Sequence, residues 1–503
     1  MIGLMGWSKR NIATGFLTLS MLFVGACSSI SSTSGDDESA TSGGTEKVIR
    51  IAIGTQDQVI NTAVGGATVR ELELLEKHLP RDGEYEGVRY DIQWSSYTSG
   101  PPITNKMLAD QIDIGLMGDF PSVINLIKFA QEAKDADSIF IGTLAYSPNG
   151  AGNAIMVPKD SDVTSLADLK GGTVSVPFGS AAHGMVLKAL SDAGLNPETD
   201  VTLISQAPEV GGSSLRTGQI DAHANFVPFG ELFPFRGFAK KIFDGAQTGT
   251  PTLHGITVRS DFAEEHPEIV VAYLKAVLEA NQMFREDPES ISAKIEEWSG
   301  VEKEVVYMFL GPSGLQALNP TIGDVQMDAL KNSIATLTSL GRIENPVDPN
   351  DVVNWTDESF LRTAMEEMGL DYDDVVATAE SYEITGEDAL TGEAIEDPKQ
   401  AAQYWVQGEE KVTNFASIAN MVKALTALQA EGQAANAMFV HDHNNGWKLF
   451  AENSYFVSNG DEVAAFLLES EAQAYASQTG GTLTAFGELQ SLYAQQPALV
   501  GTR

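Results

Sequence analysis

Residues 99–121 read SGPPITNKMLADQIDIGLMGDFP, and this stretch indicates the fold class. A Ser-Gly-Pro-Pro turn precedes a short amphipathic helix, and an apolar strand follows at once over residues 112–117. The loop Gly118-Asp119-Phe120-Pro121 then opens the next helix. Because glycines allow close approach and helix starts leave N–H groups unpaired, this arrangement suits a small anion or polar head group.

The same alternation of strands and helices continues on both sides of this stretch. Predicted strands lie at 48–53, 90–94, 139–144, 154–157, 173–176, 201–204 and 252–259, and predicted helices at 68–78, 181–193, 212–217 and 268–285. Strands that alternate with helices predict a parallel sheet with crossover helices. Two such units, separated by a Gly/Asn-rich passage, predict two lobes whose ligand gathers at the carboxyl ends of strands.

Composition places the chain among acidic globular proteins. Its 503 residues are 43% apolar and carry a formal net charge of −38. Nucleic acids and anionic lipid surfaces require clustered Lys and Arg, so the charge argues against both as partners. An anionic ligand remains compatible, because a local site can oppose the overall sign.

The N-terminus has the pattern of a bacterial lipoprotein. Lys9 and Arg10 precede an apolar run that is too short to span a membrane and ends at Val-Gly-Ala before Cys27. We therefore predict a signal peptide over 1–26, lipidation of Cys27 and a flexible tether over 27–45. The protein is expected to be exported and held at a membrane by its lipid. Cys27 is the chain's one cysteine, so no disulfide within the chain is expected.

Several spaced segments resemble one family. They are SGPP at 99–102, IDIGLMGDFP at 112–121, SLADLKGGTVSVPFGSAAHGMVLKAL at 165–190, TGQIDAHANFVPF at 217–229 and VRSDFAEEHPEIVVAYLKAVLEAN at 258–281. In this order they resemble the periplasmic binding proteins of ABC importers for nitrate, sulfonates and taurine. The resemblance implies a two-lobed type II periplasmic-binding-protein fold with crossover hinge strands. It covers about 46–370, and the substrate-binding domain is predicted over 46–375, with lobe 1 at 46–150 and 255–375 and lobe 2 at 151–254.

The resemblance also implies where ligand contacts lie. The expected ligand-binding residues are Gln56, Ser99, Gly100, Gly118, Asp119, Gly179, Ser180, Ala181, His183, Asp221, His223, Asn225 and His254. Ser99, Ser180 and nearby N–H groups would cradle an oxyanion without a full positive charge. Each serine also suits a helix cap, which is compatible with ligand binding.

Three histidines fall in the predicted cleft segments, and the sequence leaves their role open. His183, His223 and His254 are compatible with separate hydrogen-bonded imidazoles, with a pair that recognises an anion, or with a metal or metal-chelate site. Asp119 would repel a bare anion unless the ligand carries a hydrogen-bond donor.

The last part of the chain is predicted as a separate α+β module. An acidic linker over 376–395 precedes it, and a helix is expected at 463–475. Over 396–490 its segments FAS, FVHD, GWKL, YFV and GG resemble the accessory lipoprotein domain of nitrous oxide reductase (NosL-type). Members of that family bind copper partly through Cys and Met, and this module has no cysteine. His441, His443 and Met438 are weak metal candidates, so no metal or other cofactor is assigned.

These observations predict a monomeric, lipid-anchored solute-binding component of an ABC importer. It captures a small polar or anionic organic compound or oxyanion by lobe closure and delivers it to a membrane permease. The alternative is a metal or metal-complex delivery protein on the same scaffold, using cleft histidines and the NosL-like module. An enzyme of the thiamin-precursor-synthase branch is disfavoured, because Cys27 is not free and no motif fixes a nucleophile.

Overall fold

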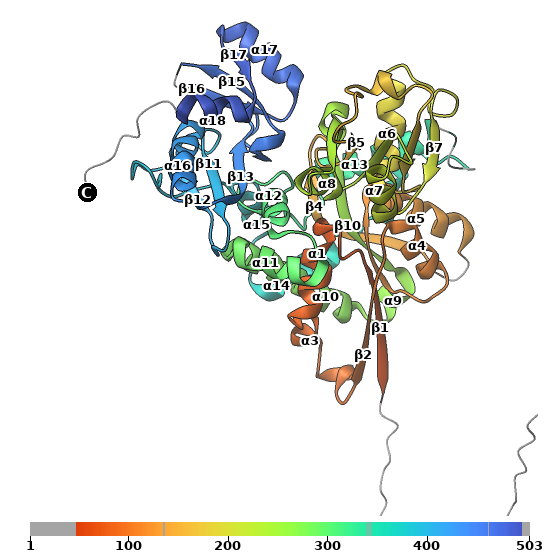
Figure 1. Ribbon diagram of the computed structural model, residues 1–503. Helices are drawn as coiled ribbons and strands as arrows, with labels where there is room; N and C mark the ends of the chain where they lie inside the picture. Colours follow the sequence, from red (N-terminus) through yellow and green to blue (C-terminus); the bar gives the residue numbers. More distant parts are fainter. Residues whose placement is uncertain are drawn as a thin grey trace, which may run out of the picture. The chain divides into compact units, whose positions relative to one another are not determined.

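The structure is a computed structural model that describes residues 47–133, 136–339, 341, 343, 345–460 and 462–494. The predicted signal peptide, Cys27 and the tether lie outside the described residues. Within the described ranges the strands form four sheets (Figure 1). No helix in these ranges has the length and apolarity needed to cross a membrane.

The first sheet has five strands in the order β2-β1-β3-β10-β4. Their bounds are Arg89–Ser96, Val48–Thr55, Ile114–Gly118, Thr252–Arg259 and Ser138–Ser147. β1 runs parallel to β2 and β3, as predicted, but β10 is antiparallel to both β3 and β4. The sheet is therefore mixed, because β10 enters it after the chain returns from the second sheet. This sheet and the helices on it are called lobe 1.

The second sheet, with its helices, is called lobe 2. Its strand order is β7-β6-β8-β5-β9. The bounds are Thr202–Ser205, Thr173–Val176, Ala222–Asn225, Ala154–Pro158 and Ala239–Asp244. β6 is parallel to β7 and β8, whereas β5 is antiparallel to β8 and β9. The chain passes from lobe 1 to lobe 2 between β4 and β5 and returns between β9 and β10.

Helices surround the two sheets. They are α1 (Ile60–Ala63), α2 (Val69–Glu71), α3 (Leu74–His78), α4 (Gly100–Leu108), α5 (Asp119–Glu132), α6 (Ala181–Asp192), α7 (Pro208–Arg216), α8 (Phe229–Phe235), α9 (Ser260–Glu265), α10 (Pro267–Glu286), α11 (Pro288–Ser299), α12 (Lys303–Leu310), α13 (Asp324–Ser339), α14 (Ser359–Met368) and α15 (Tyr372–Glu380). The continuous helix predicted at 68–78 is wrong, because Glu73 has a φ of 52° and this left-handed residue separates α2 from α3.

The C-terminal part contains the other two sheets. Strands β12-β11-β13-β14 (Thr413–Phe415, Ala402–Val406, Ala435–His441, Lys448–Phe450) form one, and β16-β15-β17 (Glu462–Phe466, Tyr455–Asn459, Thr482–Thr484) form the other. The helices are α16 (Ile418–Ala430), α17 (Glu469–Thr479) and α18 (Phe486–Ala494). The helix predicted at 463–475 is wrong: its first residues pair with β15 as strand β16, and α17 begins after them.

The C-terminal part packs on the end of α12. Tyr307 of α12 meets the Trp405 ring edge-on, with ring centroids 5.5 Å apart. Lys448 is fully buried, and its Nζ donates to Gln403 Oε1 (2.5 Å) and lies 4.0 Å from the Tyr307 ring centroid. Burial lowers the pKa of Lys448 well below its ordinary value. The Lys448 amine is therefore held between the C-terminal part and α12 by an amide oxygen and an aromatic ring.

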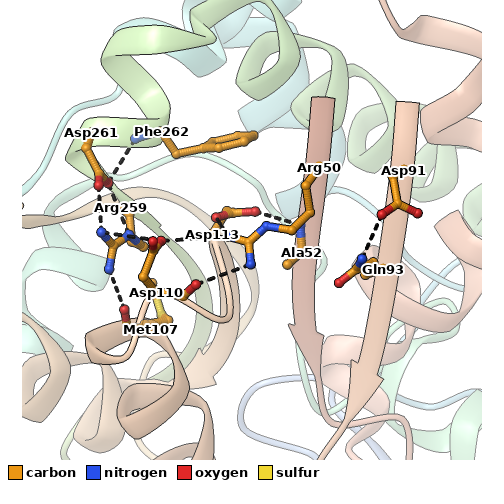
Figure 2. Close-up of polar contacts among 10 residues, drawn as sticks. All are labelled: Arg50, Ala52, Asp91, Gln93, Met107, Asp110, Asp113, Arg259, Asp261 and Phe262. Carbon is orange, nitrogen blue, oxygen red and sulfur yellow. Dashed lines mark hydrogen bonds and ion pairs between the residues drawn. The ribbon is translucent and has the colours of Figure 1, made fainter. Parts of the chain in front are cut away.

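A charged cluster fixes the strand ends of lobe 1 (Figure 2). Asp113, just before β3, accepts from the Ala52 N–H (2.7 Å) and from the Arg50 guanidinium (2.9 Å), both on β1. Arg259, at the end of β10, forms two bonds with the Asp261 carboxylate (3.1 and 2.6 Å). The Asp113 side chain is 4% exposed and that of Arg50 is 39% exposed, so the carboxylate and its bond from the Ala52 N–H are the buried part of this cluster.

We expect Asp113→Ala to lower the free energy of unfolding by about 3 kcal/mol, because it leaves a buried backbone N–H and a guanidinium without their acceptor. Urea unfolding measures the change. Asp110→Asn is the matched control, because Asp110 has a φ of 55° that asparagine tolerates. The Asp110 side chain is 71% exposed and only contacts the same arginines from outside, so a loss of about 0.5 kcal/mol or less is expected. Equal effects of the two substitutions would contradict this account.

Candidate ligand-binding site

Three helix N-termini meet between the lobes. α4 and α5 begin in lobe 1, and α6 begins in lobe 2. A Cβ built on Gly118, just before α5, would lie 3.5 Å from the Ala181 Cβ at the start of α6. A Cβ on Gly179 would lie 3.0 Å from Pro101 Cγ in α4. The positive ends of three helix dipoles therefore gather at one place, which favours an anion.

His254 supplies a further donor at this place. Asn61 Nδ2 lies 3.2 Å from His254 Nδ1, so Nδ1 of the neutral ring accepts this bond and Nε2 carries the proton. Burial lowers the pKa of His254 to about 3, which keeps the ring neutral. Nε2 lies 3.4 Å from the position that a Cβ on Gly118 would take. An N–H donor thus lies beside the start of α5.

Asp119 lies at the same helix start and is buried. Its Oδ1 accepts from the Phe120 N–H at 2.7 Å. Burial raises the pKa of Asp119 to about 7, although nearby N–H donors act in the opposite direction. Near neutral pH a large fraction of this carboxyl is therefore protonated. A protonated carboxyl is a hydrogen-bond donor, so in that form Asp119 no longer presents the negative charge that would repel an anion.

Ser180 and His183 shape the lobe 2 side. Ser180 Oγ accepts from the His183 N–H (3.3 Å) and so caps α6, as its position predicts. The His183 ring stacks on Phe178 with centroids 4.7 Å apart, and it meets Phe120 of lobe 1 edge-on at 6.2 Å. His183 therefore packs between aromatic rings of the two lobes.

Other predicted residues lie at the site or in its walls. Ser99 is extended and directly precedes Gly100 at the start of α4, without capping that helix through its side chain. Gln56, at the end of β1, is 2% exposed and donates to the Leu116 carbonyl (2.9 Å). Gln56 therefore supports the strand ends that carry the site.

Three predicted contacts need correction. Asp221 accepts from the Thr173 N–H (2.7 Å) at the amino end of β6, opposite the end that leads to α6. His223 is fully buried inside lobe 2, where Nδ1 bonds Ser175 Oγ (2.7 Å) and Nε2 bonds Asn225 Nδ2 (2.9 Å). Asn225 Oδ1 also accepts from its neighbour's N–H, so these side chains stabilise the lobe itself.

Sequence reasoning missed a buried pair of amides in this region. Asn61 Nδ2 lies 3.2 Å from Gln316 Oε1 as well as from His254, and Gln316 Nε2 donates to the Ala151 carbonyl at 2.5 Å. Asn61 Oδ1 is buried and has no hydrogen-bond partner among the described residues. Asn61 and Gln316 are 255 positions apart, so no local motif links them.

A cavity of about 40 Å³ remains between the lobes. Asp119 and Phe120 line it from α5, Met185 and Lys188 from α6, and Thr252 from β10. Lys188 is the cation in this wall, and it pairs with Asp192 at 2.8 Å. A space of this size holds a few water molecules and is too small for an organic molecule unless the lobes separate.

The metal candidates are not gathered into a site. The described residues contain no group of three His, Cys, Asp or Glu side chains that could hold a metal. His441 Nδ1 lies 2.7 Å from the Ala401 carbonyl oxygen, and the His443 ring packs against Tyr475 and Phe466. Of the histidines predicted for the cleft, His223 forms its hydrogen bonds inside lobe 2 and His254 forms its bond at the lobe junction. This arrangement agrees with separate hydrogen-bonded imidazoles.

The described structure has the type II periplasmic-binding-protein fold. The alkanesulfonate-binding protein SsuA from Xanthomonas axonopodis pv. citri, solved with bound MOPS, superposes with a TM-score of 0.50 at 22% identity, covering 61% of this chain and 98% of that one. The sequence model of the NMT1/THI5-like family matches residues 123–291.

Two sequence relatives agree with this fold. A protein of Bacillus subtilis (strain 168), named for the binding of aliphatic sulfonates, is 28% identical over 285 residues, which are 56% of this chain and 81% of the relative. The taurine-binding periplasmic protein of Escherichia coli (strain K12) is 29% identical over 259 residues, 50% of this chain and 76% of the relative. The chain is thus similar to periplasmic binding proteins over about half its length.

Proposed function

We propose that this protein is the solute-binding component of an ABC importer and that its ligand is a small organic anion or oxyanion of the sulfonate, taurine or nitrate type. The observation that carries the proposal is the meeting of the α5 and α6 N-termini beside His254 Nε2. This place offers uncharged donors from both lobes and from the strand that joins them. The relatives' names support a sulfonate or taurine as the first ligands to test.

Lobe closure is the proposed mechanism, and the protein delivers its ligand to a permease without catalysing a reaction. A ligand that bonds donors of both lobes stabilises the closed form over the open one. In the proposed protein, export and lipidation of Cys27 hold a monomer at the membrane surface. The metal-delivery alternative lacks support, because the described residues hold no metal cluster.

The proposal also divides the chain. It takes 46–150 with 255–375 as lobe 1, 151–254 as lobe 2, 376–395 as the linker and 396–490 as a NosL-like module. The assignment of strands to sheets supports these divisions, since β5 to β9 form the second sheet and β11 to β14 a separate one. The role of the module is proposed to be contact with a partner, because no cysteine is available in it for copper.

The test is a thermal-shift panel of taurine, alkanesulfonates, nitrate and bicarbonate, with copper and zinc as the metal arm, each with and without chelator. A ligand at about a hundredfold over its Kd adds about 2.7 kcal/mol and raises the Tm by several degrees. We expect a shift with an organic anion that survives chelator, and a Kd at least tenfold weaker in His254→Gln.

His443→Gln, in the C-terminal part, is the matched control and is expected to bind like the unmodified protein. A shift with metal alone, abolished by chelator, would replace the proposal with the metal-delivery alternative. Unchanged affinity in His254→Gln would remove the assigned site even if an anion binds.

A further inference from the structure

We propose a second ligand-binding site, outside the cleft between the lobes, that takes an organic monoanion with an apolar tail. It is a cavity of about 460 Å³ between α10 and the segment that contains α15. This volume lies in the range of small-molecule sites in proteins. Its lining residues Asn281 and Arg285 come from α10, and Leu370, Val375 and Tyr382 come from the segment after α14.

The polar floor of this cavity is incompletely satisfied. Asn281 is 3% exposed, and neither its Nδ2 nor its Oδ1 has a hydrogen-bond partner in the described part of the chain. Such a buried amide is costly unless something bonds it. Arg285 lies four residues later on α10, hence on the same face of the helix. Both polar atoms of the Asn281 side chain and Arg285 Nε are covered by protein atoms, so a ligand reaches these donors when the two side chains turn toward the cavity.

Arg285 carries a charge with no carboxylate partner among the described residues. One guanidinium nitrogen bonds the Leu318 carbonyl, and Nε is buried without a hydrogen-bond partner there. The Tyr382 hydroxyl bonds the Arg285 carbonyl oxygen at 3.4 Å, which closes the wall beside it. A carboxylate or sulfonate would supply the missing counter-charge and, once these side chains turn toward the cavity, accept from Nε and Asn281 Nδ2.

The walls determine the rest of the ligand. Leu278, Pro320, Leu370 and Val375 give the cavity a mainly apolar lining. Glu286, Asp371 and Asp374 also line it, and all three residues are exposed. Each of these carboxylates repels an anion, and Arg285 neutralises one negative charge, so a ligand with more than one is disfavoured. The chemistry that fits is a single anionic head at Arg285 with an alkyl or aryl tail along the apolar wall.

Octanesulfonate below its micelle concentration is the probe, measured by isothermal titration calorimetry on the full chain, with 1-octanol as the uncharged comparison. If both sites exist, octanesulfonate binds two sites in the unmodified protein, and we expect the second of these binding events to remain, with unchanged affinity, in His254→Gln, in which the cleft site is impaired. We expect at least tenfold weaker binding when Arg285→Gln is added to that background. Octanol should bind at least tenfold more weakly than octanesulfonate.

A second variant, Asn281→Leu, tests whether a loss of octanesulfonate binding is caused by misfolding. It removes an unsatisfied buried amide in exchange for a side chain of similar size, so the melting temperature should not fall while octanesulfonate affinity drops severalfold. Arg236→Gln, which removes an exposed arginine paired with Glu302, is the matched control and should bind normally. Two results would overturn the second site and leave the cleft proposal standing. One is equal octanesulfonate affinity in the His254→Gln protein with and without Arg285→Gln. The other is no octanesulfonate binding to the His254→Gln protein.

Discussion

Lowering the pH from 7 to 5 is expected to reduce the free energy of unfolding by about 3 kcal/mol. Protonation of three buried histidines reduces it by about 5 kcal/mol, and protonation of one buried aspartate increases it by about 2 kcal/mol. Burial lowers the pKa of His223 to about 4 and those of His254 and His441 to about 3. In the unfolded chain these rings titrate near 6.5. Their contribution is therefore present above pH 6.5 and is lost as the pH falls through the folded values.

Hydrogen-bond geometry adds to burial in two of these rings, His223 and His254. Nε2 of His223 faces the Asn225 amide nitrogen, and that amide cannot turn over without losing the bond from the Phe226 N–H to Asn225 Oδ1. Protonated His223 would thus place one donor against another. The His254 Nδ1 faces the Asn61 amide nitrogen in the same way. Protonation therefore costs His223 and His254 a hydrogen bond as well as the burial of a charge, whereas His441 is kept neutral by burial and by Lys448.

Asp119 acts in the opposite direction. Its folded pKa of about 7 lies above the unfolded value near 3.9, so its contribution is fully present below pH 4 and is lost as the pH rises through 7. Asp119→Asn removes this gain on acidification. The loss between pH 7 and 5 should then increase from about 3 to about 5 kcal/mol.

Urea unfolding at pH 7, 6 and 5 tests the contributions of the histidines and of Asp119. Each variant is compared by how its free energy of unfolding changes with pH, and its absolute stability at one pH is not used. His441→Gln should reduce the acid loss by about 2 kcal/mol, because one ring no longer takes up a proton on unfolding. Stability that stays constant or rises between pH 7 and 5 in the unmodified protein would contradict the assignment of neutral buried rings.

Local sequence was sufficient for the elements that local chemistry determines. The serine before α6 does cap the helix, and the apolar run at 173–176 is strand β6 with the bounds that were predicted. Strand β9 was not predicted, because AKKIFD contains two lysines. In the structure Lys241 is 13% exposed and pairs with Glu231 and with Asp244 (2.9 Å), so tertiary partners make this charged segment compatible with a sheet.

The site itself depended on partners that are distant in sequence. His223 follows the family pattern, yet Ser175, 48 positions away, holds it inside lobe 2. Asn61 has no motif around it, and its place beside His254 arises from the meeting of α1 with β10, 193 positions later in the chain. Spacing can place a residue at a strand end, but it does not show which face of the sheet or which neighbour receives the side chain.

Gly184→Leu is expected to weaken anion binding at the cleft by 10- to 100-fold through an effect on lobe closure. Gly184 lies inside α6 of lobe 2, and a Cβ there would lie 2.8 Å from two ring carbons of Phe120 in lobe 1. A leucine would overlap that ring in the closed form, and overpacking of this kind costs about 1–3 kcal/mol. Within the helix, leucine is favoured over glycine by nearly 1 kcal/mol, so lobe 2 itself should fold at least as well.

The measurement is the Kd for an alkanesulfonate, together with small-angle scattering with and without ligand, which reports closure directly. Ser191→Leu, on the exposed side of the same helix, is the matched control and should bind normally. The double variant Gly184→Leu/Phe120→Ala should recover much of the affinity, because the smaller side chain gives the leucine room. If Gly184→Leu binds normally, the contact between α5 and α6 is not part of the ligand-bound form, and closure must be assigned to other surfaces of the two lobes.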